Sequence, residues 1–264
     1  MDRSELGERY DVVVIGGGAA GLSGALALAR ARRSVLVVDG AEPRNAPADA
    51  VHNYLGREGS PPGELLATGR AEVAGYGATV VTATVLTVRR LDGPLDRATG
   101  GFAVDLADGR AVRARRLLVT TGLVDELPQV PGLAQRWGHD VLHCPYCHGW
   151  EVRDKAIGVL ATSPLAAEQA LMWRQWSDDV TLLLHTTDDV TDAEAEQLAA
   201  RDVAVVTGKV MSLEVHDDAL TGVRLSSGQS VQLQALVVAP RRTHAPTCSP
   251  PWGCSRARSG SANT

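Results

Sequence analysis

The sequence predicts an α/β protein of two successive units, each a parallel β-sheet flanked by helices and followed by antiparallel strands. Short runs of Val, Ile and Leu, typical of buried parallel strands, alternate with helical stretches rich in Ala and Leu. A glycine-rich turn joins the first strand to the first helix. The strand–helix–strand order returns after residue 154, so the chain repeats its architecture.

The first unit opens on a strand, a glycine turn and a helix. The apolar run 11–15 leads into Gly16-Gly17-Gly18-Ala19-Ala20-Gly21, which matches G-x-G-x-x-G, and a helix is expected over 22–32. Gly16 permits a tight turn, Gly18 lets the backbone approach a pyrophosphate, and Gly21 lets helix and strand pack closely. The helix N-terminus then presents free N–H groups to the phosphates.

An acidic residue completes this pattern. The second strand, 34–38, ends at Asp39, where a carboxylate accepts hydrogen bonds from a ribose. Strand, glycines, helix, strand and acid occur in the expected order, which predicts a dinucleotide site. The position of the site at the start of the chain, with a second nucleotide-type unit downstream, favours FAD.

The remaining strands divide the chain into two Rossmann-like domains with three-layer ββα architecture. The first, 1–122, adds strands at 79–83, 85–88, 101–106, 111–112 and 116–119. The second, 123–240, is expected to contain strands at 155–160, 180–184, 204–206, 209–215, 222–225, 230–231 and 235–240, with a helix over 165–176. A third segment, 241–264, contains no Leu, Ile, Val, Met or Phe, and is expected to be a disordered tail.

The second domain carries Cys144-Pro145-Tyr146-Cys147, followed directly by His148. This motif is typical of a redox disulfide, of half a metal site or of covalent haem attachment. The N-terminus has no apolar segment typical of a signal peptide, and no apolar run approaches the roughly 20 residues that span a bilayer. The net charge of −5 gives no indication of a nucleic-acid partner. We therefore expect a cytoplasmic protein with no membrane or nucleic-acid partner, in which a redox pair is favoured over haem attachment.

Zinc is the other alternative for this motif. His143, Cys144, Cys147 and His148 offer ligands, but zinc sites usually draw on two separated pairs, and the only other cysteines, Cys248 and Cys254, lie in the tail. We therefore predict no metal. His143 is interpreted as a residue that flanks the motif, although it could assist His148.

Two nucleotide-type units with Cys-x-x-Cys opening the second resemble the low-molecular-weight thioredoxin reductase family of FAD disulfide oxidoreductases, over residues 10–240. Residues 51–56 resemble the family segment near the flavin ring, and Thr120-Thr121-Gly122 resembles the turn that closes the first FAD segment. The resemblance implies bound FAD with the redox disulfide facing its isoalloxazine ring, and a homodimer. The implied cofactor-binding residues are Gly16, Gly18, Ala19, Ala20, Gly21, Asp39, Gly40, Arg44, Asn45, Asn53, Val85, Thr120, Thr121 and Gly122.

The second nucleotide site departs from this family. Its loop reads Gly158-Val159-Leu160-Ala161-Thr162-Ser163-Pro164, so we expect Gly158 to be the one glycine that remains of the motif. Family reductases bind the NADPH 2′-phosphate with a basic cluster, whereas this chain has His185-Thr186-Thr187-Asp188-Asp189. We expect weak or absent NAD(P)H binding, and a variant loop that still binds NAD(P)H is the alternative.

His148 stands where family reductases place an Asp. Cys-x-x-Cys-His with a degraded NADPH site resembles the dithiol oxidases of the gliotoxin and holomycin type, which use FAD and O₂ to oxidise small-molecule dithiols and release hydrogen peroxide. The resemblance implies that Cys144 exchanges with substrate, that Cys147 is flavin-proximal, and that His148 deprotonates incoming thiols.

Two alternatives stay open. An NAD(P)H-dependent reductase would act on a thioredoxin-like protein. A flavin-binding remnant is the other, because the segment that closes the FAD domain in the resembled family is not visible after Pro240. We hypothesise that a frameshift or truncation produced the tail, and expect FAD retention to be weak.

Overall fold

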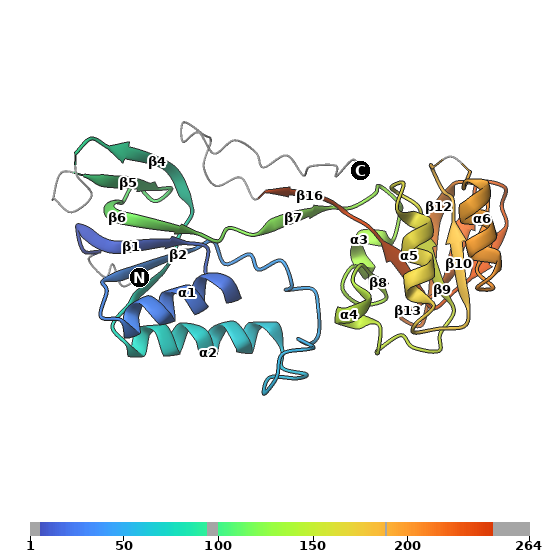
Figure 1. Ribbon diagram of the computed structural model, residues 1–264, viewed down its shortest axis with the longest axis horizontal. Helices are drawn as coiled ribbons and strands as arrows, with labels where there is room; N and C mark the ends of the chain where they lie inside the picture. The colour runs from blue at the N-terminus through green and yellow to red at the C-terminus, as the bar shows by residue number, and fades with distance from the viewer. Residues whose placement is uncertain (1–5, 94–99, 188, 245–264) are drawn as a thin grey trace. The chain divides into compact units, whose positions relative to one another are not determined.

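The computed structural model describes residues 6–93, 100–187 and 189–244, which fall into two compact units (Figure 1). Of the described residues, 6–44, 63–93, 100–124 and 244 belong to the first, and 45–62, 125–187 and 189–243 belong to the second. Segment Asn45–Pro62, expected in the first domain, thus belongs to the second unit. Among the described residues, no helix has the length and apolar character needed to span a membrane.

The first unit is built on a six-stranded sheet of order β3-β2-β1-β6-β5-β4. Strands β1, β2, β3 and β6 are parallel, and β4 and β5 are antiparallel. Its elements are β1 (Arg9–Ile15), α1 (Ala19–Arg30), β2 (Val35–Asp39), α2 (Pro62–Gly75), β3 (Thr79–Thr82), β4 (Val85–Leu91), β5 (Gly101–Leu106) and β6 (Ala111–Val119).

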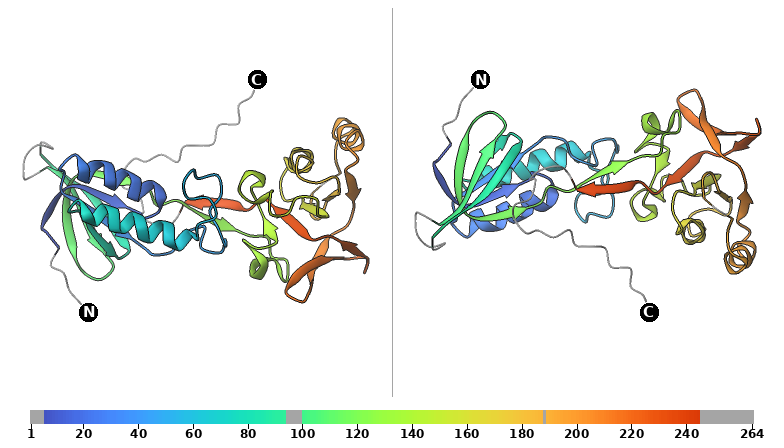
Figure 2. Two further views of the ribbon diagram at one scale, coloured as in Figure 1. Left: turned by 90° about the horizontal axis from the view of Figure 1, so that it is seen from below. Right: turned by 90° about the horizontal axis from the view of Figure 1, so that it is seen from above.

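Alternating side chains of β1 build two cores, one on each face of this sheet. Val12 and Val14 pack with Leu22 and other residues of α1 and α2, whereas Val13 and Ile15 pack with apolar residues of β4 and β5. Helices α1 and α2 therefore cover one face of the parallel strands. Strands β4 and β5, at the antiparallel end of the sheet, pack against the other face, as Figures 1 and 2 show. This confirms the three-layer ββα prediction for the first unit.

The second unit repeats the arrangement around a five-stranded parallel sheet of order β11-β10-β9-β15-β8. Helices α5 and α6 pack on one face, and the antiparallel sheet β12-β13-β14 covers the other. Its elements are α3 (Leu133–Arg136), β8 (Val141–Leu142), α4 (Pro145–His148), β9 (Ile157–Leu160), α5 (Ala166–Trp173), β10 (Val180–Leu183), α6 (Asp192–Ala199), β11 (Ala204–Val206), β12 (Val210–His216), β13 (Ala219–Leu225), β14 (Ser230–Gln232) and β15 (Ala235–Val238).

Two strands differ from the expectation. The strands expected at 111–112 and 116–119 are one continuous strand, β6, because Val112 and Ala114 point into the core while Ala111 and Arg113 are exposed. The segment 241–244, expected to be disordered, forms β16 (Arg241–His244) beside β7 (Leu123–Glu126). Strand pairing uses backbone groups, so β16 needs no apolar side chains, and Arg241 forms an ion pair with Glu126. Residues 245–264 lie outside the described part of the chain.

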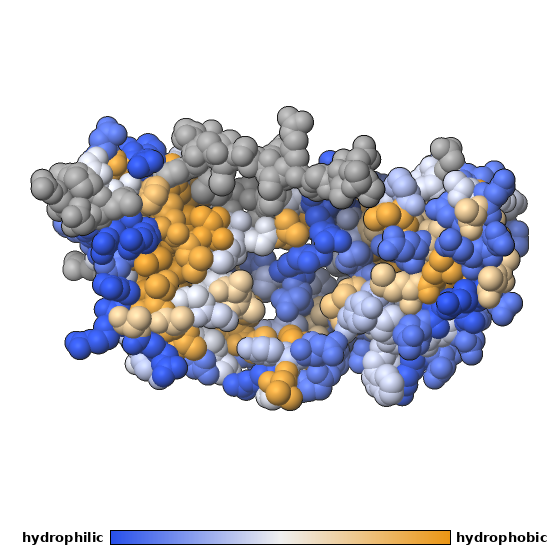
Figure 3. Space-filling model, viewed as in Figure 1, coloured by the Kyte–Doolittle hydropathy of each residue, from blue (hydrophilic) through white to orange (hydrophobic). Residues whose placement is uncertain are grey.

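Apolar side chains also reach the surface of the first unit. On the face drawn in Figure 3, this unit shows a larger apolar patch than the second. Its exposed apolar side chains include Leu86 and Val119, which are 56% and 58% exposed. Patches of this kind are less common than scattered apolar residues on protein surfaces.

Candidate active site

The glycine turn of the first unit lies between the end of β1 and the start of α1. A side chain at Gly16, whose φ is +105°, would overlap the Thr120 carbonyl oxygen, and one at Gly21 would overlap the Gly16 carbonyl oxygen. The Thr120 hydroxyl donates to the carbonyl oxygens of Ile15 and Gly16 at 3.1 and 2.9 Å. These two glycines are therefore required by the fold itself. No atom lies within 4 Å of the place that a Gly18 side chain would occupy, so a ligand can approach the backbone there.

These residues fit the dinucleotide that the sequence predicts. Helix α1 has 12 residues, and its N-cap Gly18 makes no side-chain cap, so its first N–H groups can donate to the phosphates of a bound dinucleotide. Asp39 ends β2, and its Oδ1 accepts from the Gly17 and Ala41 N–H groups at 3.3 and 3.2 Å. The turn, Asp39 and Thr120 thus lie together at the carboxyl ends of parallel strands, where FAD would place its phosphates and ribose.

The other residues predicted to bind the cofactor are more dispersed. Gly40, Arg44 and Gly122 are exposed, and Thr121 follows Thr120 at the end of β6. The Val85 side chain is buried in the core, so only its backbone faces outward. Asn45 and Asn53 belong to the second unit. These assignments stay predictions.

A substitution at Gly18 separates the folding and binding roles of this turn. Gly18 has φ −73°, so Gly18→Ala should fold with a stability change within about 1 kcal/mol. The methyl group would occupy the space needed by the pyrophosphate, and we expect FAD affinity to fall about tenfold or more. Thermal unfolding and flavin fluorescence titration measure the two effects. Gly63→Ala, also in open space, is the control, and equal FAD affinity in both variants would contradict the assignment.

The corresponding loop of the second unit differs from the expectation. Gly158 lies inside strand β9, where a side chain would collide with Leu233, so it is a packing residue and not a loop glycine. The loop between β9 and α5, residues 161–165, contains no glycine at all. The Ser163 hydroxyl oxygen already accepts from the Leu165 N–H at 3.3 Å. The expectation that one motif glycine remains is therefore wrong, and this loop is further from the dinucleotide pattern than the sequence suggested.

The described residues that follow the next strand, β10, include no Lys or Arg that could bind a phosphate before residue 188. His185 follows β10 with φ +53°, and its Nδ1 accepts from the Val210 N–H at 3.1 Å. Burial lowers the pKa of His185, and nearby Lys209 lowers it further, so this imidazole stays neutral at physiological pH. Asp189 is exposed, and Asp188 lies outside the described residues.

The cysteine pair occupies a single turn of the second unit. Cys144 directly precedes α4, and Cys147 lies within it, so the two Sγ atoms are 2.6 Å apart. Neither is joined in a disulfide; Cys144 is half-buried and Cys147 is exposed. A disulfide needs an S–S distance near 2.05 Å, so this pair can close with little movement. The turn therefore provides a reversible dithiol that is accessible from solvent.

Two histidines flank the pair and differ in their surroundings. His143 Nδ1 donates to the Val238 carbonyl oxygen at 3.2 Å, and its Nε2 accepts from Arg242 at 3.0 Å, so both ring nitrogens are engaged. His148 ends α4 and is half-buried. Burial lowers the pKa of His148 more than the negative charge of Glu151 raises it. At neutral pH His148 is therefore an uncharged imidazole that can accept a proton from a thiol.

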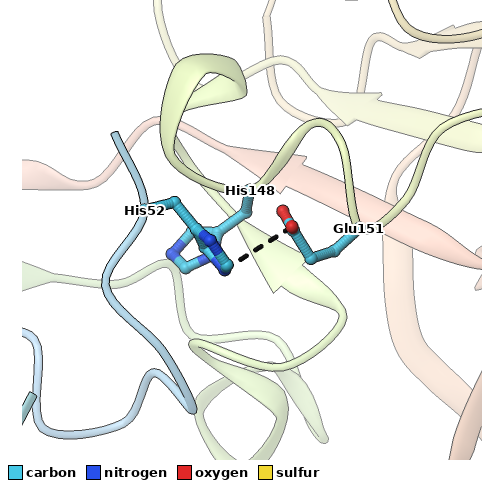
Figure 4. A group of neighbouring side chains, drawn as sticks. All are labelled: His52, His148 and Glu151. Carbon is cyan, nitrogen blue, oxygen red and sulfur yellow. Dashed lines mark ion pairs between the residues drawn. The ribbon is translucent and has the colours of Figure 1, made fainter. Parts of the chain in front are cut away.

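The structure brings two further side chains to this histidine, His52 and Glu151, and a third, Glu58, to His52, none of which was predicted from the sequence. His52 lies with its ring perpendicular to that of His148, at a centroid distance of 6.2 Å, and Glu151 lies one turn beyond His148 (Figure 4). Glu58 accepts a hydrogen bond from His52 Nδ1 at 2.6 Å. The i, i+3 spacing of His148 and Glu151 was a visible signal, whereas His52 is brought in from segment Asn45–Pro62 by tertiary structure alone.

Asn53, in segment Asn45–Pro62, forms a hydrogen bond with the cysteine turn. Its side-chain amide donates to the Tyr146 carbonyl oxygen, and its backbone N–H donates to Glu58 at 2.9 Å. Beside it lies a hollow of about 430 Å³, lined by residues that include Tyr146, Trp150, Trp176, Cys147, Glu58 and Glu151. Tyr146 and Trp176 meet edge to face at 5.4 Å, which gives the hollow an aromatic wall next to a reactive thiol.

Comparison with known proteins identifies the family to which the chain belongs. A family model described as pyridine nucleotide-disulphide oxidoreductase matches residues 10–244. Thioredoxin reductase tcpT of Claviceps purpurea is 37% identical over 59% of this chain and 47% of its own length. Thioredoxin reductase aclD of Aspergillus oryzae is 35% identical, over 60% and 49%. The chain therefore spans about half the length of these curated relatives.

Solved structures agree with this placement. The crystal structure of HlmI is 51% identical, with a TM-score of 0.84 over 88% of this chain and 72% of that chain. The oxidoreductase from Agrobacterium tumefaciens is 35% identical, with a TM-score of 0.81 over 91% and 82%. Family membership implies FAD as cofactor, in agreement with the open glycine turn. The chain belongs to the pyridine nucleotide-disulphide oxidoreductase family, among its thioredoxin reductase-like members.

Proposed function

We propose that this chain acts as a FAD-dependent dithiol oxidase, which converts a small-molecule dithiol to a disulfide and passes the electrons to O₂. The observation that carries the proposal is the loop 161–165, which has no glycine where an NAD(P)H-dependent enzyme of this family needs a close backbone approach to pyrophosphate. The cysteine pair is intact while the pyridine nucleotide loop is not. A dithiol that enters at the cysteines is then the electron donor.

The first steps use residues of this chain only. A substrate thiol gives its proton to His148, and the thiolate attacks Cys144 of the enzyme disulfide, which releases Cys147 as a thiolate. The second substrate thiolate attacks the substrate sulfur of the mixed disulfide and releases Cys144. The substrate leaves as a disulfide, and two electrons remain on the cysteine pair. When bound, FAD supplies the oxidation of this pair, and O₂ takes up two electrons and two protons as hydrogen peroxide.

A second candidate is an NAD(P)H-dependent disulfide reductase that acts on a thioredoxin-like protein. The names of the relatives favour it, since two of them are called thioredoxin reductases. In this case electrons would travel the other way, from the pyridine nucleotide to the cysteine pair. The absence of glycine in loop 161–165 weighs against this candidate.

Oxygen consumption with dithiothreitol tests the proposal. We expect the FAD-loaded chain to consume O₂ and form hydrogen peroxide in proportion to dithiothreitol oxidised, without NADPH. The double variant Cys144→Ser/Cys147→Ser, loaded with FAD to the same level, is the control for flavin oxidase activity that bypasses the cysteines. Oxygen uptake that requires NADPH would favour the reductase, and a chain that binds no FAD would favour the remnant.

The proposal includes a cytoplasmic homodimer. It rests on the composition of the chain and on the family resemblance, and light scattering of the FAD-loaded chain measures the assembly. A mass of about 56 kDa is expected for a dimer, which is twice the 27.8 kDa of the chain. A monomer at working concentrations would contradict this part of the proposal.

A further inference from the structure

His148 lies in a small network of acidic and basic side chains. A ring nitrogen of His52, a ring nitrogen of His148 and a carboxylate oxygen of Glu151 all lie within 4.8 Å of one another. His52 Nε2 is 3.5 Å from Glu151 Oε1, an ion pair drawn as a dashed line in Figure 4. On its other side, His52 Nδ1 is 2.6 Å from Glu58 Oε1. The network links a half-buried base to carboxylates at the surface.

The orientation of His52 follows from its partners. Glu58 is held by the Asn53 N–H and by His52, and the hydrogen bond from His52 lowers the pKa of Glu58, so its carboxylate stays charged. His52 therefore donates through Nδ1 and directs Nε2 at Glu151. The 3.5 Å approach of His52 Nε2 to Glu151 Oε1 keeps this carboxylate beside His148.

The proposed oxidation requires a group that takes up the proton from His148. Each dithiol loses two protons in succession while it forms its disulfide, and His148 can hold only one of them at a time. His148 must therefore release its first proton before it accepts the second. Its half-buried position limits direct exchange with water, whereas the Glu151 side chain is 40% exposed. A separation within 4.8 Å is short enough for a transfer through a single water molecule.

We propose that Glu151 accepts the proton from His148 and passes it to solvent, and that His52, fixed by Glu58, is the positioning residue that holds Glu151 in place. This inference rests on the proposed function. The proton moves from a substrate thiol to the His148 ring, then to a Glu151 oxygen and to water, and no electron moves in these steps. Other groups that face His148 are Asp49, whose charge also acts on it, and the thiols of the same turn.

The pH dependence of the dithiol step tests this role. Glu151→Gln removes a negative charge that raises the pKa of His148, so the acid limb of the rate against pH should move to lower pH. It also removes the acceptor, so the maximal rate should fall about tenfold. The rate of cysteine reduction by dithiothreitol, followed between about pH 5 and 9, gives both values. Glu196→Gln, at an exposed site on α6, is the matched control.

A second readout does not depend on turnover. An NMR titration of the histidine ring signals in the full chain, with His148 assigned through His148→Gln, reports its midpoint directly. We expect Glu151→Gln to move the His148 midpoint to lower pH and Glu196→Gln to leave it in place, with a chelator present to exclude metal ions. His52→Gln should reduce the maximal rate less than Glu151→Gln does.

The outcomes separate the two proposals. If dithiothreitol is not oxidised but the NMR midpoint moves as expected, the proposed function fails while the network holds. If turnover is normal and Glu151→Gln changes neither the midpoint nor the maximal rate, the relay is wrong and the proposed function stands. A rate loss without a shift in midpoint would mean that Glu151 is merely structural, which also overturns the inference.

Discussion

Replacement of either Cys144 or Cys147 by serine is expected to reduce dithiol oxidation by about a thousandfold or more. The two Sγ atoms lie 2.6 Å apart in one turn, so within the described part of the chain each is the partner with which the other forms the disulfide that the substrate reduces. Serine changes the volume little, and the free energy of unfolding should stay within about 1 kcal/mol of the parent value. Oxygen uptake with dithiothreitol measures the effect.

The two variants also distinguish the roles of the cysteines. The resemblance assigns exchange with substrate to Cys144, whereas the structure gives Cys147 the greater exposure. When Cys147→Ser is treated with a small disulfide reagent, the remaining Cys144 should accumulate a mixed disulfide, which mass spectrometry detects. If Cys144→Ser instead forms this adduct much faster, the two roles are reversed. Turnover at the parent rate in either variant would contradict a redox role for the pair.

The second large effect is expected for His148→Gln. A neutral imidazole beside the cysteine turn removes a proton from an incoming thiol, and general base catalysis contributes about 10²–10⁴-fold. We therefore expect kcat/KM for dithiothreitol to fall about a hundredfold at neutral pH. The deficit should shrink as pH rises towards about 8.5, because thiols then ionise without a base.

An exposed histidine provides the control for this variant. His216 has a side chain that is 81% exposed, so His216→Gln should leave kcat/KM unchanged at every pH.

The lowered pKa of His148 also predicts the pH dependence of the parent chain. Because burial lowers this pKa, the base form persists below the usual range of histidine, and the acid limb of the rate should lie below about pH 6.5. A His148→Gln deficit that does not depend on pH would show that His148 is not the base.

Local sequence signals predicted the glycine turn and the cysteine motif well. Gly16 and Gly21 face backbone atoms that only glycine can approach, so their spacing alone indicated the strand–turn–helix geometry. The Cys-x-x-Cys spacing likewise places both sulfurs in one turn. Such features depend on neighbours in the sequence, and they were found where the pattern placed them.

Features that depend on long-range packing were not visible in the sequence. Gly158 looked like a remnant of a phosphate loop, but it lies in a strand, where a larger side chain would collide with Leu233. His52 lies 96 residues before His148 (148 − 52) and meets it only because segment Asn45–Pro62 packs with the second unit. Arg241 and its neighbours form a strand because β7 offers a backbone partner, which composition does not reveal.

Anaerobic reduction of the flavin shows directly which donor supplies electrons to the cysteine pair. The FAD-loaded chain is mixed with dithiothreitol or with NADPH in a stopped-flow instrument, and flavin absorbance is followed without O₂. We expect dithiothreitol to bleach the flavin, NADPH not to bleach it, and Cys144→Ser/Cys147→Ser to be bleached by neither. Rapid bleaching by NADPH, with slow or no bleaching by dithiothreitol, would contradict the oxidase proposal and identify a pyridine nucleotide-dependent reductase.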